Sequence, residues 1–198
     1  MATVEQVFYH ELGHFVANEL NRIYYSGLGV SSISIFPCKE DPSKFCGGTT
    51  PIKPVDHDEN EKKPPPLERL AEYLARVVHG CIFQSYYQQV TLDQCLEING
   101  QNDQGYWNGA LISYNLFYNR KIFFEIQNNY DQKVQKNKLL ESFMSLNPID
   151  YLIESKPDHY DVDLEKLSEN IHASIENYFP CYRTLVDSYQ NEINKTGN

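Results

Sequence analysis

Two histidines, His10 and His14, stand four residues apart near the start of the sequence, and Glu11 directly follows the first of them. Residues four apart lie on the same face of an α-helix, with their Cβ atoms about 5–6 Å apart. Both imidazoles can therefore reach one metal ion. Glu11, one position along the helix, points beside that ion instead of binding it. The spacing predicts a metal site with two histidine ligands and a carboxylate next to it.

Zinc is the ion that suits this arrangement best, because it binds neutral imidazole nitrogens in a tetrahedral shell. Two histidines and one further protein ligand leave the fourth position open for water. Zinc lowers the pKa of such a water to about 7, and a neighbouring carboxylate can accept its proton during attack on a peptide carbonyl. The motif therefore predicts that His10 and His14 are zinc ligands and that Glu11 is the general base of a peptidase.

The third ligand cannot be identified from local spacing, because it comes from another part of the fold. Several carboxylates lie near predicted secondary structure, and each of them taken alone is most simply a solvated surface group. A glutamate ligand at position 68 or 72 would place the protein among the gluzincin peptidases. The candidates are Glu40, Glu68, Glu72, Glu97 and Asp103.

The histidines belong to a segment with the pattern of an amphipathic helix over residues 4–24. Apolar residues recur there at every third or fourth position. Thr3 followed by Gln6 fits a capping box at the start of this helix. Residues 30–36 then alternate between polar and apolar, which predicts a short strand, with residues 47–50 as its candidate hairpin partner.

The middle of the chain begins with a charged, proline-rich stretch at residues 53–66, which has little to bury and is predicted to be a flexible loop or linker. An amphipathic helix is expected over residues 67–88. Residues 97–107 contain two glycines and are predicted to form a loop that enters a third helix. That helix is expected to continue through Phe124.

The C-terminal part is again predicted to be helical after Pro148, with a kink or break at Pro180. The 198 residues, 41% of them hydrophobic, suffice for one domain with its own core. The sequence therefore predicts a single domain over residues 1–198. Its predicted class is mainly α (α+β), with a small β element after the motif helix.

Charge and hydropathy argue against two classes of partner. The chain has 17 Lys and Arg against 27 Asp and Glu, a formal net charge of −10, and no basic cluster that could follow a phosphate backbone. Nucleic acid is therefore not an expected partner. No apolar run approaches the roughly 18 residues of a membrane span, and the first residues do not resemble a secretory leader. A soluble, cytoplasmic protein is expected.

The cysteines are predicted to be reduced thiols, most of them buried. Their number is odd, they form no C-x-x-C pair, and the chain shows no secretory signal, which argues against a disulfide framework. They are Cys38, Cys46, Cys81, Cys95 and Cys181.

The stretch YHELGH resembles the HEAGH helix of the FtsH-type proteases, zinc peptidases that are normally fused to a hexameric AAA+ ATPase. The resemblance runs collinearly over roughly residues 5–110. VSSISIFP and the later GGTT are similar to a strand and hairpin of the family, and LERLAEYLARVVHGCIFQSYY takes the place of its L-GG-R-A-A-E helix. INGQND is similar to the family's TGASND segment, whose aspartate is the third zinc ligand.

The resemblance implies a role for each matching residue. His10 and His14 match the zinc-binding histidines, and Glu11 matches the catalytic base. Asp103 matches the ligand aspartate and is thereby favoured over the other four carboxylates. The implied fold is an FtsH-like peptidase domain, with a helical core and a small β-hairpin or sheet after the motif helix.

Two departures from the family bear on function. Its Arg and Glu on the second helix are replaced here by Cys81 and Gln84, so the groups that support the ligands are expected to differ. The chain has no G-x-x-x-x-G-K-[ST] motif and cannot hydrolyse ATP by itself. Any unfolding activity would have to come from a separate ATPase. His79, on the same helix, is predicted to be a core or surface histidine.

The leading hypothesis is a zinc endopeptidase that hydrolyses peptides or unfolded proteins, alone, as a homo-oligomer or with a separate ATPase. The alternative is a catalytically idle, FtsH-like zinc-binding domain that acts as a binding or assembly module. The intact Glu11 favours the enzyme, because drift away from activity usually removes the base or a ligand. The changes at Cys81 and Gln84 keep the alternative open.

Overall fold

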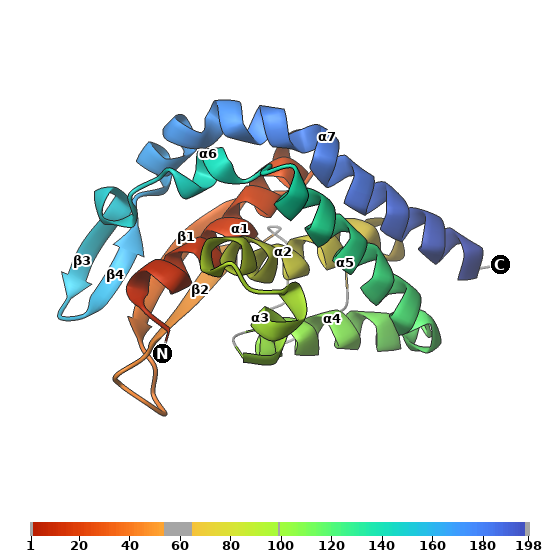
Figure 1. Ribbon diagram of the computed structural model, residues 1–198, viewed down its shortest axis with the longest axis horizontal. Coiled ribbons are helices and arrows are strands. Elements are labelled where there is room, and N and C mark those ends of the chain that lie inside the picture. The colour runs from red at the N-terminus through yellow and green to blue at the C-terminus, as the bar shows by residue number, and fades with distance from the viewer. Residues whose placement is uncertain (1, 54–64, 99, 197–198) are drawn as a thin grey trace.

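The computed structural model describes residues 2–53, 65–98 and 100–196, so most of the predicted charged loop at 53–66 lies outside the described residues. The described chain is mainly helical with a small antiparallel sheet, as expected (Figure 1). Its helices and strands are α1 (Val4–Tyr24), β1 (Val30–Pro37), β2 (Phe45–Pro51), η1 (Leu67–Arg69), α2 (Leu70–Gln88), α3 (Leu92–Ile98), α4 (Gln101–Ser113), η2 (Phe117–Asn119), α5 (Arg120–Lys136), α6 (Glu141–Met144), η3 (Pro148–Tyr151), β3 (Leu152–Lys156), β4 (His159–Val162) and α7 (Leu164–Thr196).

Helix α1 has the predicted bounds and the predicted capping box. The Gln6 amide N–H donates to Thr3 Oγ1 at 3.2 Å, and the Thr3 N–H donates to Gln6 Oε1 at 3.0 Å. The helix packs closely against α2, because a Cβ placed on Gly13 would overlap the backbone carbonyl of His79. A glycine at this position therefore brings the motif helix and α2 close together.

The sheet has the strand order β2-β1-β4-β3, and all three strand pairs are antiparallel. The predicted hairpin of β1 and β2 is present, with Ile35 opposite Gly47. The prediction of a helical tail after Pro148 was wrong at its start, because β3 and β4 form a second hairpin there. β4 pairs with the distant β1, which aligns Ile35 with Tyr160. Such a pairing leaves no local periodicity in the sequence.

The predicted loop at residues 97–107 was also wrong, since the end of α3 and the start of α4 occupy it. Trp107, Ala110 and Leu111 of α4 are buried and recur at the spacing of one helical face. The third helix does not continue to Phe124, because α4 ends at Ser113 and α5 begins a new helix. Packing of this face outweighs the unfavourable helix propensity of the glycines in α4.

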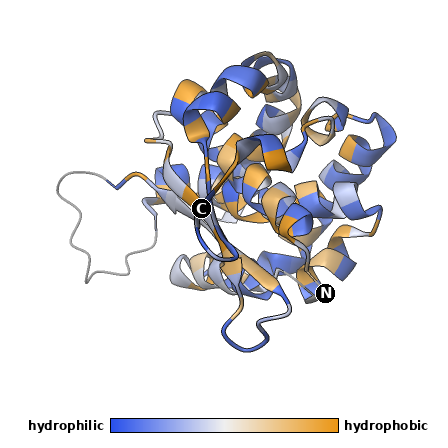
Figure 2. Ribbon diagram, turned by 90° about the vertical axis from the view of Figure 1, so that its left-hand side faces the viewer, coloured by the Kyte–Doolittle hydropathy of each residue, from blue (hydrophilic) through white to orange (hydrophobic). Residues whose placement is uncertain are grey.

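The final helix, α7, continues past Pro180, so the predicted break is absent, whereas the predicted kink is not tested. It extends along one side of the molecule and contacts α2 and α5 (Figure 1). Its buried residues include Tyr178, Tyr182 and Tyr189. Figure 2 shows hydrophobic and hydrophilic residues alternating along the helices, as expected for helices that each turn one face inward. None of the described helices combines the length and hydropathy needed to cross a membrane.

The expectation of reduced cysteines was wrong for one pair. Cys38 and Cys46 form a disulfide at the end of the β1–β2 hairpin, where their Cα atoms lie 5.2 Å apart. Antiparallel pairing brings them together, since Phe36 lies opposite Cys46 in the register. The other three cysteines are free and buried, as predicted.

His79 is a core residue, which confirms one of the two roles predicted for it. Its side chain is inaccessible to solvent, its Nδ1–H donates to the Ala75 carbonyl at 2.7 Å, and its Nε2 lies 3.2 Å from the hydroxyl of Tyr178. The Tyr130 and Tyr178 hydroxyls are 2.6 Å apart. Burial lowers the pKa of His79 to about 4, so the imidazole is neutral in the folded protein.

The buried His79 is expected to make the metal-free protein less stable as the pH falls from 6.5 towards 4. The unfolded chain takes up a proton near the ordinary pKa, whereas the folded chain takes it up only near the lowered one, so acid favours unfolding. The difference between the two pKa values corresponds to roughly 3 kcal/mol. Urea denaturation at about pH 7 and about pH 4.5 measures the loss. His79→Gln should show a shallower pH dependence, and an equal dependence in both proteins would contradict the expectation.

Candidate metal centre

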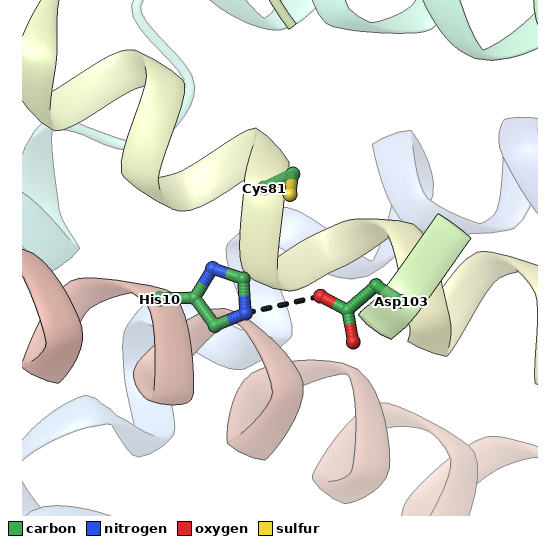
Figure 3. Close-up of side chains that lie close together, drawn as sticks. All are labelled: His10, Cys81 and Asp103. Atoms are coloured by element: carbon green, nitrogen blue, oxygen red, sulfur yellow. Dashed lines mark ion pairs between the residues drawn. The ribbon is translucent and has the colours of Figure 1, made fainter. Parts of the chain in front are cut away.

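Three predicted site residues come together where α1, α2 and the first turn of α4 meet. His10 Nε2 lies 3.0 Å from Asp103 Oδ2, and His14 Nε2 lies 3.3 Å from the same oxygen. The two Nε2 atoms are 3.2 Å apart. Figure 3 shows His10 and Asp103 pointing toward each other from α1 and α4. The three atoms form a nearly equilateral triangle.

The dimensions of this triangle fit a zinc ion. Nitrogen and oxygen ligands lie about 2.0–2.1 Å from tetrahedral zinc, which places neighbouring ligand atoms about 3.3 Å from one another. The three observed distances, from 3.0 to 3.3 Å, are close to this value. His10, His14 and Asp103 can therefore form one face of a zinc tetrahedron.

Hydrogen bonds to the far side of each imidazole show where the lone pairs lie. His10 Nδ1 is 3.0 Å from the Gln84 side-chain oxygen, and His14 Nδ1 is 3.1 Å from the backbone carbonyl of Arg76. Both oxygens can only accept, so each Nδ1 carries the hydrogen and each Nε2 presents a lone pair. Such bonds are the usual way in which ligand histidines are oriented.

The third corner of the triangle is an orphaned oxygen. Asp103 Oδ2 is buried and accepts no hydrogen bond from the part of the chain that the structure describes. When both Nε2 atoms are unprotonated, this oxygen faces two nitrogen lone pairs. Three converging lone pairs repel one another unless a proton or a metal ion lies among them, and the donor set of two imidazoles and a carboxylate fits a metal ion.

The electrostatics of the metal-free site indicate the same need for positive charge. Burial alone would raise the pKa of Asp103, but the neighbouring His14 and His10 outweigh it and hold that pKa below its usual range. Burial alone would lower the pKa of His10, but the Asp103 carboxylate outweighs it and raises that pKa well above its ordinary value. The carboxylate is thus ionised, and a proton or a metal must balance it.

Glu11 lies next to the triangle but takes no part in it. Its side chain is buried, and its Oε2 accepts a hydrogen bond of 2.7 Å from the hydroxyl of Thr49 on β2. Gly47 of the same strand approaches so closely that a Cβ there would lie 2.7 Å from Glu11 Oε1. Strand β2 therefore holds the carboxylate in place beside the motif histidines.

The site opens into a cleft with a volume of about 1390 Å³. The three triangle residues and Glu11 line it, and so does Gly48 of β2. β2 is one of the two edge strands of the described sheet. An edge strand presents backbone groups that can pair with an extended peptide, so the cleft joins a candidate metal site to a surface suited to peptide backbone.

Gly80 of α2 is a site residue that the sequence alone did not identify. A Cβ on it would lie 2.8 Å from His10 Nε2 and still closer to His14 Nε2. Glycine inside a helix costs roughly 1 kcal/mol relative to alanine, so its position opposite the motif is a signal that something packs closely there. The Arg76 carbonyl was missed as well, because nothing in its local sequence marks it as a partner of His14, whereas Gln84 stands at a position where the resemblance already implied a change in ligand support.

The other four candidate carboxylates lie apart from this site. Glu40, Glu68 and Glu97 are exposed, and Glu72 forms an ion pair of 3.2 Å with Arg69. Among the described residues, none of these four belongs to a cluster of three or more metal-ligating side chains. The structure thus places Asp103, and none of the alternatives, beside both histidines.

Comparison with protein-family models, with curated proteins and with solved structures finds no match to this chain. The case for a metal centre therefore rests on the atoms of the site itself.

Proposed function

We propose that the protein is a zinc-dependent metallopeptidase of FtsH type. The observation that supports this best is the triangle of converging lone pairs beside a buried glutamate, in an open cleft. His10, His14 and Asp103 would hold the ion. Zinc, when bound there, supplies a Lewis acid and a water whose pKa is lowered to about 7.

The chain's own residues account for the remaining steps. Glu11 accepts the proton of the attacking water at its carboxylate and passes it to the leaving amine as the peptide bond breaks. The Thr49 hydroxyl fixes one oxygen of that carboxylate at 2.7 Å. The second oxygen, Oε1, is the one that lies beside Gly47. Gln84 and the Arg76 carbonyl hold the imidazoles in the tautomer that metal binding requires.

The substrate class follows from the cleft. The edge of β2 favours an extended backbone, so peptides and unfolded proteins are the proposed substrates. A folded protein would have to be unfolded first, and the chain contains no ATP-binding motif that could drive unfolding. Cleavage of folded substrates would therefore require a separate ATPase partner.

Metal content of the purified protein tests this proposal. We expect close to one zinc ion per chain in the wild type and an empty site in His10→Ala and His14→Ala. In Asp103→Ala the zinc affinity should fall by at least 10- to 100-fold, the loss that is typical when a hydrogen-bond partner of a metal ligand is removed. Glu72→Ala is the matched control, because it removes a carboxylate of α2 that lies outside the triangle.

Two zinc measurements would overturn the proposal. One is wild-type protein without zinc after expression in metal-replete cells. The other is a Glu72→Ala variant that loses the metal while Asp103→Ala keeps it, which would mean that the third ligand has been assigned wrongly.

A further inference from the structure

A buried thiol lies next to the candidate metal centre and has no part in the mechanism above. The Sγ atom of Cys81 and the ligand atoms of His10 and Asp103 all lie within 4.8 Å of one another. Figure 3 shows the thiol of Cys81, on α2, beside the facing pair from α1 and α4. The side chain of Cys81 is inaccessible to solvent, and it is not among the residues that line the cleft.

We propose that Cys81 is a fourth protein ligand, which can bind the metal in place of water and close the site. This inference rests on the proposed function, because it concerns the same ion. Zinc binds thiolate readily, at about 2.3 Å, and sites with four protein ligands are typically structural, whereas catalytic sites keep one position open. The site would thus have an open, catalytic state and a closed, latent one.

The Cys81 sulfur has to move only a short distance to bind the metal. Sulfur and nitrogen ligands of one tetrahedral zinc ion lie about 3.5 Å apart. Sγ lies within 4.8 Å of the His10 and Asp103 ligand atoms, so it has to approach them by about 1.3 Å or less, and it must also approach His14, which is not part of this group. The thiol is confined on its other side, because a Cβ on Gly100 would overlap Sγ. Gly100 caps α4, the helix that carries Asp103 in its first turn. The thiol and the carboxylate ligand therefore lie against the same end of one helix.

The surroundings of Cys81 differ from those of an ordinary core cysteine. Its neighbours include the thiol of Cys95, which donates to the Gln84 side-chain oxygen at 3.4 Å, the same oxygen that orients His10. Cys181, also buried and free, belongs instead to the tyrosine cluster around Tyr130. Of the two thiols near the site, Cys81 is the one whose sulfur groups with metal-ligating atoms.

Binding of Cys81 replaces a water ligand of the metal by a thiolate. The S–H bond of Cys81 breaks, its proton goes to solvent, and the sulfur lone pair forms a bond to the metal as the water leaves the fourth position. No oxidant or reductant takes part. Because the bound thiolate removes the water that Glu11 would deprotonate, the closed state cannot hydrolyse a peptide.

Cobalt(II) in place of zinc tests this proposal by absorption spectroscopy, without any assay of activity. Thiolate bound to cobalt(II) gives an intense near-ultraviolet charge-transfer band. We expect this band in the wild type, its loss in Cys81→Ser, and its retention in Cys95→Ser, the matched control that removes the neighbouring thiol. X-ray absorption at the zinc edge of the wild type should show a sulfur neighbour at about 2.3 Å, which gives a second measurement if Cys81→Ser does not fold.

The outcomes also separate this inference from the proposed function. A wild-type protein that binds cobalt(II) through His10 and His14 but shows neither the band nor a sulfur neighbour would overturn the role of Cys81 alone. A band that survives Cys81→Ser or disappears in Cys95→Ser would overturn it as well. Cobalt(II) binding that is unchanged in His10→Ala would instead overturn the metal centre.

Discussion

Glu11→Gln is expected to bind zinc as the wild type does and to hydrolyse an unfolded substrate such as casein about 10²- to 10⁴-fold more slowly. The physical reason is that Glu11 is not a ligand: its carboxylate lies outside the triangle of His10, His14 and Asp103 and is held by Thr49. Glutamine keeps the shape and can still accept the Thr49 hydrogen bond, but it is too weak a base to take a proton from water. Release of casein fragments at equal zinc content measures the effect.

Two controls accompany this comparison: a surface variant, and a background variant that cannot form the closed site. Glu169→Gln removes an exposed carboxylate of α7 and should leave hydrolysis unchanged. Repeating the comparison in a Cys81→Ser background separates a missing base from a closed site. If wild type and Glu11→Gln are equally inert in both backgrounds while both hold zinc, the peptidase proposal is wrong and the binding-module hypothesis replaces it.

Gly80→Ala is expected to lower zinc affinity by at least 10- to 100-fold, although residue 80 carries no ligand atom. The added Cβ would lie 2.8 Å from His10 Nε2 and closer still to His14 Nε2. Neither ring can move aside freely, because Gln84 and the Arg76 carbonyl hold their Nδ1 atoms. Competition with a chromophoric chelator measures the affinity.

Gly105→Ala is the matched control for Gly80→Ala, since it makes the same change inside a helix next to the site. A Cβ on Gly105 meets nothing within 4 Å, so this variant should keep wild-type zinc affinity and gain up to about 1 kcal/mol of stability from helix propensity. Circular dichroism shows whether each variant is folded. A folded Gly80→Ala protein with wild-type affinity would show that the imidazoles do not occupy the metal-binding positions assigned to them.

The sequence by itself determined the part of the site that depends on local geometry. The apolar period and the Thr3–Gln6 capping box were enough to place α1 from Val4 to Tyr24, and a spacing of four on that helix places His10 and His14 on one face. The alternation in β1 likewise identified the strand that pairs with β2. These features depend on neighbours within a few residues, which the sequence states directly.

Only the tertiary structure decided which distant groups meet this face. Spacing left Asp103 as one of five candidate carboxylates and the resemblance only favoured it, whereas the position of α4 brings it to 3.0 Å from His10. The local signals around the start of α4 even pointed the wrong way, because glycines at 100 and 105 suggested a loop, whereas burial of Trp107 on one face favours a helix.

Packing alone also brings further groups to the site and to the sheet. The close approach of Gly80 and the nearness of the Cys81 thiol depend on how α2 packs against α1 and α4, and the pairing of β4 with β1 joins segments more than 100 residues apart. Residue types and spacing specify what each side chain can do. Which side chains act together is set by burial of the apolar faces between helices, an energy that is summed over the whole chain.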